Sequence, residues 1–280
     1  MAPSISPAAE PLLARDRELA QLTELLGAAH DGAGRPLLIE GEAGIGKSRL
    51  LRELGAIAAR SGFTTLAARA DPLATEIAFG VVLELVEPLA AARDAERDAL
   101  FAGAASLALP LFSPRRPDDG DAAAERFAHG TFRLLANAAA RRPLLLLVDD
   151  VQWVDRGSLR VLAHVAARLG AQPLALVAAV RRGEPAADSA GLEQLRLEPA
   201  LALLQPRPLP LDAVPRLATA AGLQQPSAEL CAACAASTGG NPLLLKALLS
   251  ELAQRGEPAA PADVAAGVPL VARHVRGQLS

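Results

Sequence analysis

The clearest chemical signal in this chain of 280 residues is the segment 41–48, which reads Gly-Glu-Ala-Gly-Ile-Gly-Lys-Ser. Its glycines allow the backbone to curl with positive φ, so that successive N–H groups face an anion. The segment follows the apolar run 36–39 and leads into a helical pattern, which adds the positive end of a helix. Lys47 can reach the β- and γ-phosphates, and the Ser48 hydroxyl can bind Mg²⁺.

This segment is therefore predicted to be a phosphate-binding loop for a nucleoside triphosphate with Mg²⁺. The alternative is a glycine-rich hairpin or helix cap, which the strand before the loop and the helix after it disfavour. The predicted cofactor-binding residues are the loop and the position after it: Gly41, Glu42, Ala43, Gly44, Ile45, Gly46, Lys47, Ser48 and Arg49.

A pair of carboxylates provides the second part of such a site. Asp149 and Asp150 end the uncharged run 143–148, which is typical of a buried strand. Ligands of parallel sheets bind at the carboxyl ends of the strands, so both side chains are expected beside Ser48. We predict that Asp149 holds the metal together with Ser48 and that Asp150 orients and polarises the attacking water. The alternative is two solvated carboxylates at the end of a strand.

Arg181 is the third candidate, because it follows the apolar strand pattern 173–180 and emerges at the same edge. We predict that it senses the γ-phosphate and acts in catalysis with Lys47 and Asp150. Arg182 competes for this role, and an arginine after a strand is often only a solvated cap.

The elements that must position these residues follow a regular pattern. Apolar runs alternate with helical patterns, which indicates a parallel sheet with helices on both faces. The expected strands lie within 36–39, 63–69, 143–148, 173–180 and 202–209, and the expected helices within 11–29, 49–54, 77–108, 122–141 and 158–169. Beyond residue 210 only helices are expected, within 212–221, 227–237 and 242–254. The predicted fold class is α/β, a parallel-sheet P-loop NTPase core followed by a smaller all-helical lid.

The predicted domain boundaries follow from these patterns. Residues 1–10 are expected to be a disordered leader, 11–210 the NTPase core, 211–256 the helical lid, and 257–280 a linker with the start of another helix. Cys231 and Cys234 lie in a helical pattern without a second pair of ligands. We therefore expect two small buried side chains rather than a zinc site.

Composition excludes several classes of partner. The net charge is −3, and only 2% of residues are aromatic, so neither a basic surface nor stacking platforms for nucleic acid are evident. No uncharged stretch reaches the ~20 residues that cross a bilayer, and no signal peptide is recognisable. A cytoplasmic protein without a membrane or nucleic-acid partner is expected.

Taken together, these residues resemble the nucleotide-binding module of STAND-class signalling ATPases, a branch related to AAA+ proteins. The similarity is greatest to the ATPase domain of large ATP-binding LuxR-type transcriptional regulators. It rests on the phosphate-binding loop and three further segments: 13–19, similar to the family's hydrophobic-Gly-Arg-Glu-x-Glu motif; 144–155; and 238–243, similar to its Gly-x-Pro motif. The resemblance implies that ATP is the nucleotide and that Arg15 and Pro242 lie near adenine. Ala14 stands where the family usually has glycine.

The resemblance also implies further domains. In such regulators the lid is followed by a winged helix, a helical-repeat sensor and a helix-turn-helix domain. Residues 268–273 resemble the start of the winged helix, so a truncated fragment is expected, and DNA binding is assigned to domains outside it.

Three functions agree with the sequence. The first is a regulatory switch that binds ATP or ADP, hydrolyses ATP slowly and signals to downstream domains. The second is a nucleotide sensor that binds without hydrolysis, and the third is a P-loop phosphotransferase, for which no acceptor pocket is evident. Nucleotide-dependent self-association is left open.

Overall fold

The computed structural model describes residues 12–113, 121–254, 260–261 and 263–264. The predicted leader and the predicted winged-helix start lie outside the described residues, as does most of the predicted linker. The chain divides into two compact units, one comprising 18–42 and 47–206 and the other 1–17, 43–46 and 207–280. Each unit is described on its own.

The larger unit is built on a parallel sheet of five strands: β1 (Pro36–Gly41), β2 (Thr64–Arg69), β3 (Leu144–Asp149), β4 (Leu174–Arg181) and β5 (Ala202–Leu204). Their spatial order is β2-β3-β4-β1-β5, and every paired strand runs parallel to its neighbour. The predicted fold class is confirmed. The central strands β3 and β4 are almost entirely buried, because side chains on both faces of the sheet are covered by helices.

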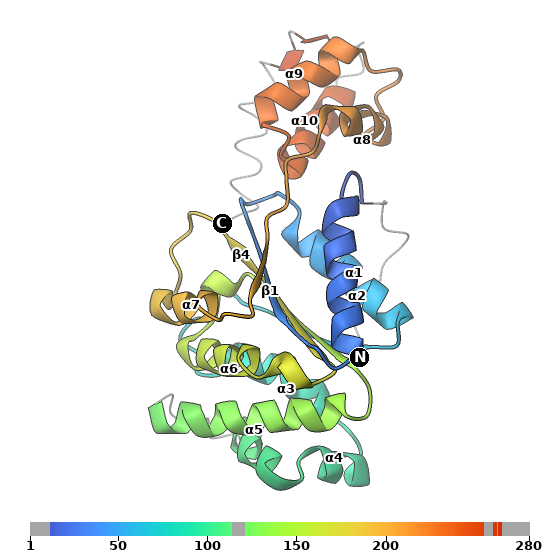
Figure 1. Ribbon diagram of the computed structural model, residues 1–280. Helices are drawn as coiled ribbons and strands as arrows, with labels where there is room; N and C mark the ends of the chain where they lie inside the picture. Colours follow the sequence, from blue (N-terminus) through green and yellow to red (C-terminus); the bar gives the residue numbers. More distant parts are fainter. Residues whose placement is uncertain (1–11, 114–120, 255–259, 262, 265–280) are drawn as a thin grey trace. The chain divides into compact units, whose positions relative to one another are not determined.

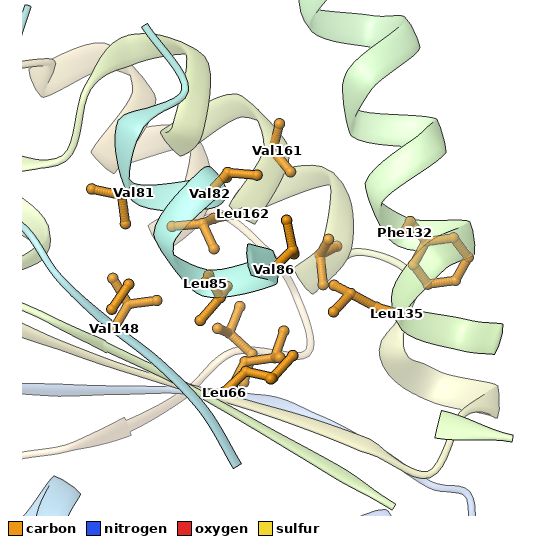
Figure 2. Packing of buried hydrophobic residues seen from close by; sticks show 14 of the residues in the cluster. Leu66, Val81, Val82, Leu85, Val86, Phe132, Leu135, Val148, Val161 and Leu162 are labelled. Atoms are coloured by element: carbon orange, nitrogen blue, oxygen red, sulfur yellow. The ribbon is translucent and has the colours of Figure 1, made fainter. Parts of the chain in front are cut away.

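Helices cover the sheet on both sides (Figure 1). On one face, α1 (Asp16–His30) and α2 (Lys47–Arg60) pack on the strands, and Gly55 of α2 approaches Leu147. The other face carries α3 (Gly80–Ala90), α5 (Asp121–Ala139), α6 (Arg156–Ala166) and α7 (Ser189–Arg196). Figure 2 shows this core, in which Val82 and Leu85 of α3 lie among side chains from the sheet, α5 and α6.

One buried carboxylate fixes the start of α3. Asp155 Oδ1 accepts hydrogen bonds from the Phe79 N–H at 2.8 Å and the Ser158 N–H at 2.9 Å. The same side chain therefore caps α6 and holds the chain before α3. Phe79 has φ +57°, and a Cβ at Gly157 would lie 2.8 Å from its ring. Gly157 is thus required for this close approach.

The segment between α3 and α5 contains α4 (Asp94–Leu100) and the 3₁₀ segment η1 (Gly103–Phe112). The expected helical region 77–108 is therefore helical in three separate pieces. Short 3₁₀ turns also occur at η2 (Val151–Trp153) and η3 (Leu169–Ala171). The eight-residue helix α7 was not predicted, because it is too short to show a clear apolar period.

The smaller unit contains η4 (Leu211–Ala213), α8 (Val214–Ala220), α9 (Ala228–Thr238) and α10 (Pro242–Gln254). These confirm the helical C-terminal region. The Ser227 hydroxyl caps α9 by accepting from the Leu230 N–H, and Asn241 caps α10.

Cys231 and Cys234 are buried in the core of this helical unit, as expected. Burial raises the pKa of the Cys234 thiol to about 11, with a smaller contribution from Cys231, so Cys234 stays protonated at neutral pH. Among the described residues, no group of three or more His, Cys, Asp and Glu side chains is placed to hold a metal ion. Within the same part of the chain, no helix is both long and apolar enough to cross a membrane.

Candidate nucleotide-binding site

The candidate side chains of the larger unit meet at the carboxyl edge of the sheet. Gly41 at the end of β1 is in register with Arg181 at the end of β4. Arg69 at the end of β2 is in register with Asp149 at the end of β3. Because β4 lies between β1 and β3, the start of α2 and both carboxylates lie at one edge of one sheet. This is the edge at which parallel sheets bind ligands.

Lys47, the first residue of α2, is 6% exposed and is folded back onto the loop. Its Nζ donates to the Gly41 carbonyl at 2.8 Å and the Glu42 carbonyl at 2.9 Å. Burial lowers the pKa of Lys47, and the Arg181 charge lowers it further, whereas Asp150, Asp149 and Glu184 act in the opposite direction. The Lys47 ammonium thus interacts electrostatically with the charged residues at the carboxyl edge of the sheet.

The two residues predicted to hold a metal, Ser48 and Asp149, fit Mg²⁺ in their chemistry. Ser48 is exposed beside Lys47, and Asp149 is partly exposed at the end of β3. Asp149 Oδ1 accepts one hydrogen bond, from the Asp150 N–H at 3.0 Å. A hydroxyl and a carboxylate are hard oxygen donors, and Mg²⁺ typically takes few protein ligands and completes its shell with phosphate oxygens and water.

Asp150 has a different environment from Asp149. It is 4% exposed, and its backbone has φ +55°, in the left-handed region. Aspartate tolerates this region better than most residues, and such strain is common at functional sites. The backbone turn directs the carboxylate toward two arginines, Arg69 and Arg181, and toward Gln152.

Four hydrogen bonds occupy the Asp150 carboxylate. Its Oδ2 accepts from Arg69 Nε at 3.1 Å and Nη2 at 3.0 Å, and its Oδ1 accepts from Arg181 Nε at 2.9 Å and Gln152 Nε2 at 3.1 Å. A carboxylate offers about four lone-pair sites in total. In this conformation the Asp150 carboxylate therefore has no free site with which to accept a proton from water.

The side chains that bind Asp150 lower the pKa of its carboxyl group. Burial alone would raise the pKa of Asp150, but the hydrogen bond from Gln152 and the charges and hydrogen bonds of Arg181 and Arg69 lower it below its ordinary value. A carboxylate with a lowered pKa is a weak base. Asp150 becomes a better base only when one arginine releases it.

Arg181, rather than Arg182, belongs to this cluster. Burial acts to lower the pKa of Arg181, but Asp150 and Glu184 together raise it, and its Nη1 lies 3.2 Å from Glu184 Oε1. Its backbone N–H donates to Gln152 Oε1 at 3.1 Å. Arg182 instead reaches Glu40 at 3.5 Å, and its side chain is 54% exposed.

Two residues of this cluster, Arg69 and Gln152, escaped the sequence analysis. The only available signal for Arg69 was its position at the end of a predicted strand, and Gln152 lies in a segment noted for its similarity alone. Trp153 packs partly against the core and, with Arg69, lines a cavity of about 180 Å³.

The tip of the loop, residues 43–46, belongs to the smaller unit together with Arg15 and Pro242. Gly44 and Gly46 have φ +78° and +106°, as the phosphate-binding pattern predicts. Arg15 is buried; its Nη2 donates to the Ile45 carbonyl at 3.0 Å, and its Nη1 donates to the Arg207 carbonyl at 2.6 Å. Pro242 is the first residue of α10.

Comparison with known proteins decides the family. The model of the AAA ATPase domain matches residues 11–177, more than half of the chain. The chain belongs to this family. An AAA ATPase domain binds a nucleotide, typically with Mg²⁺, in agreement with the loop and the carboxylates of the sheet edge.

The AAA ATPase domain has relatives in sequence and in fold. A protein of Rhizobium meliloti (strain 1021), itself uncharacterized, is 30% identical over 213 residues, which cover 68% of this chain and 20% of the relative. The chain thus spans about a fifth of that relative's length. Among solved structures, Cdc6p from Pyrobaculum aerophilum has a TM-score of 0.54 at 17% identity and covers 91% of this chain and 66% of that one. The Aeropyrum pernix ORC2 protein, determined as ADPNP-ADP complexes, has a TM-score of 0.52 at 15% identity. The match covers 96% of this chain and 70% of the ORC2 chain. These structures support the AAA ATPase fold.

Proposed function

We propose that this chain is the ATP-binding switch module of a STAND-class signalling ATPase, such as a LuxR-type transcriptional regulator. It binds Mg-ATP and hydrolyses it slowly. The observation that carries this proposal is the meeting of Lys47, Asp149, Asp150 and Arg181 at the carboxyl edge of the sheet.

Each side chain has a distinct role in the proposed mechanism. Lys47 leaves the loop carbonyls that it contacts and binds the β- and γ-phosphates. Ser48 and Asp149 would hold Mg²⁺, which would supply charge neutralisation at the phosphates. Arg181 binds the γ-phosphate, and Asp150 orients the attacking water.

Slow turnover is supported by the state of Asp150. The carboxylate that should accept the proton of water is buried and fully hydrogen-bonded. If the γ-phosphate attracts Arg181, that arginine gives up its bond to Oδ1, and Asp150 gains one free site. Arg69 and Gln152 still bind the carboxylate and keep it a weak base, so turnover stays slow. ATP itself thereby prepares the base, whereas ADP leaves Arg181 on Asp150. This difference in contacts between the two nucleotide states is what a switch requires.

The STAND assignment is supported by segments at both ends of the described chain. The Arg15 and Asn241-Pro242 segments lie in one compact unit with the loop tip, as a module that reads the nucleotide requires. Because the chain spans a fifth of the Rhizobium relative, the sensor and the helix-turn-helix domain are proposed for the parent protein rather than for this segment.

The test is steady-state phosphate release from ATP by the wild type and by Asp150→Asn, with and without small alcohol or carboxylate acceptors. The switch predicts slow, acceptor-independent release by the wild type and none by the variant. Release that depends on an acceptor would instead indicate a phosphotransferase. Tight ATP binding without release by either protein would indicate a sensor that does not hydrolyse.

A further inference from the structure

Three donors of the smaller unit bind the main chain of the loop tip, residues 43–46. Asn241 Nδ2 donates to the Ala43 carbonyl at 2.9 Å, the Leu243 N–H to the Gly44 carbonyl at 3.3 Å, and Arg15 Nη2 to the Ile45 carbonyl at 3.0 Å. Three consecutive main-chain carbonyls are thus bound by a side-chain amide, a backbone N–H and a guanidinium.

These bonds determine the direction of the neighbouring N–H groups. A trans peptide is planar, so the C=O of one residue and the N–H of the next point in opposite directions. None of the described peptides is cis. Each donor that binds a carbonyl of residues 43–45 therefore directs the N–H of the following residue, 44, 45 or 46, away from itself. Those are the N–H groups that a phosphate-binding loop offers to its anion.

Asn241 performs two tasks at once. Its Oδ1 accepts from the Leu243 N–H at 3.0 Å and the Leu244 N–H at 3.4 Å, which caps α10, while its Nδ2 reaches Ala43. The residue is 8% exposed, and both the nitrogen and the oxygen of its amide have hydrogen-bond partners in this orientation. A Cβ on Gly44 would lie 2.8 Å from Asn241 Oδ1 and 2.7 Å from Leu243 Cβ, which shows how closely α10 begins against the loop.

We propose that Asn241 is a positioning residue for the phosphate-binding loop: by holding the Ala43 carbonyl, it aims the loop N–H groups at the phosphates. This inference rests on the proposed function, because it requires a polyphosphate ligand. It assigns to Asn241 an effect on nucleotide affinity without any contact to the nucleotide. By reciprocity, a bound polyphosphate must protect the start of α10 from opening.

The test uses two substitutions that keep the helix cap. Serine and aspartate cap helices about as well as asparagine. The aspartate carboxylate has no donor for the Ala43 carbonyl, and the serine hydroxyl is one bond shorter than the Asn241 amide and does not reach that carbonyl while it caps α10. The expected result is that Mg-ATP binds about 5- to 10-fold more weakly to Asn241→Ser and to Asn241→Asp, the range that corresponds to one lost hydrogen bond. The melting temperature of Asn241→Ser should stay close to that of the wild type.

A probe without a base separates positioning from a contact to adenine. Mg-tripolyphosphate, measured by competition with a fluorescent ATP analogue, should lose affinity for Asn241→Ser by the same factor as Mg-ATP. Loss for Mg-ATP alone would overturn the proposal, because it would place Asn241 at the adenine.

A matched control comes from the other capped helix of the same unit. Ser227→Ala removes the cap of α9, where the Ser227 hydroxyl binds the Leu230 N–H. It should lower the melting temperature and leave both affinities unchanged. Equal loss of affinity in Ser227→Ala would show that Asn241 acts only through lid stability, and this too would overturn the proposal.

The remaining outcomes separate this inference from the proposed function. Failure of the wild type to bind either Mg-ATP or Mg-tripolyphosphate would overturn both. Normal binding by the wild type and equally tight binding by Asn241→Ser would overturn the inference alone. Loss in Asn241→Asp but not in Asn241→Ser would also overturn it, since the added charge would then be the cause.

Discussion

The two regions to which the phosphate-binding loop contributes residues, the sheet edge and the loop tip, use different chemistry. At the sheet edge, charged side chains compensate one another, as Asp150 does with Arg69 and Arg181. At the loop tip, the acceptors are main-chain carbonyls, held by Asn241, Arg15 and a backbone N–H. The first region can change partners when a charged ligand arrives. The second region fixes the direction of the loop main chain, and its uncharged carbonyls have no reason to change donors when a charged ligand binds. Chemistry is thus assigned to the edge and positioning to the tip.

The largest effect is expected at Lys47, which links the sheet edge to the loop. Lys47→Ala removes the ammonium that offsets phosphate charge, and Mg-ATP affinity should fall at least about 100-fold, the equivalent of two strong charge-assisted hydrogen bonds. Calorimetric titration measures this, with circular dichroism as the check that the fold is retained. ATP affinity equal to that of the wild type would contradict the proposal that Lys47 at the sheet edge binds the phosphates.

Asp150→Asn should lower the free energy of unfolding by about 2–3 kcal/mol, because a buried partner of two arginines loses its charge. Urea denaturation measures this loss. Asp149→Asn is the matched control and should change stability by less than about 0.5 kcal/mol, since an amide oxygen can still accept from the Asp150 N–H. Equal losses in both variants would contradict the distinction between the two carboxylates.

The pH dependence of stability in the wild type and Asp150→Asn follows from the direction in which the pKa of Asp150 is shifted. The pKa of Asp150 is lower in the folded than in the unfolded protein, so its stabilising effect is complete above the unfolded value, about 4. That effect is lost as pH falls through the folded pKa. The stability difference between the wild type and Asp150→Asn should therefore be constant near neutral pH and shrink below about pH 4. A difference that grows on acidification would contradict the assignment.

Arg69→Ala should affect stability less than Asp150→Asn does, and it should raise turnover rather than abolish it. The Arg69 side chain is 68% exposed, so its ion pair should contribute less than about 1 kcal/mol. Its removal frees Oδ2 of Asp150, and phosphate release should rise several-fold at unchanged ATP affinity. Arg182→Ala, which removes an exposed arginine that reaches Glu40, should leave turnover unchanged. Turnover that stays the same in Arg69→Ala would show that saturation of Asp150 does not limit the reaction.

The smallest effect is expected near the loop tip, at Ala14. Its φ of +51° lies in the left-handed region, which explains why glycine is usual at this position of the motif. Ala14→Gly should raise the free energy of unfolding by up to about 1 kcal/mol. Ala20→Gly, at an exposed position within α1, should instead lower it by a similar amount. Thermal unfolding checks the two signs.

The parts of this molecule that the sequence predicts are those with local signals. Continuous apolar runs identified the strands, and the Asn-Pro pair identified the start of α10. The loop pattern and the acidic pair predict Lys47 and Asp149 as site residues, because these residue types at these positions have few other uses, and their roles stay predictions.

The parts that could not be predicted depend on which strands become neighbours. Arg69 acquires its role only because β2 pairs with β3 in the register that places it beside Asp149. Gln152 joins the cluster because η2 places it beside the end of β4, where its Oε1 accepts a hydrogen bond from the Arg181 N–H. Main-chain acceptors such as the Ala43 carbonyl have no sequence signature at all, so the partner of the Asn241 amide became evident only in three dimensions.

The most direct test of the central claim is a crystal structure with a non-hydrolysable ATP analogue and Mn²⁺, whose anomalous signal locates the metal. One peak is expected within coordination distance of both the Ser48 hydroxyl and the γ-phosphate, on the side of the Asp149 carboxylate, with Lys47 moved from the Gly41 carbonyl onto the phosphates. A metal or triphosphate bound elsewhere, with Lys47 still on Gly41, would contradict this claim.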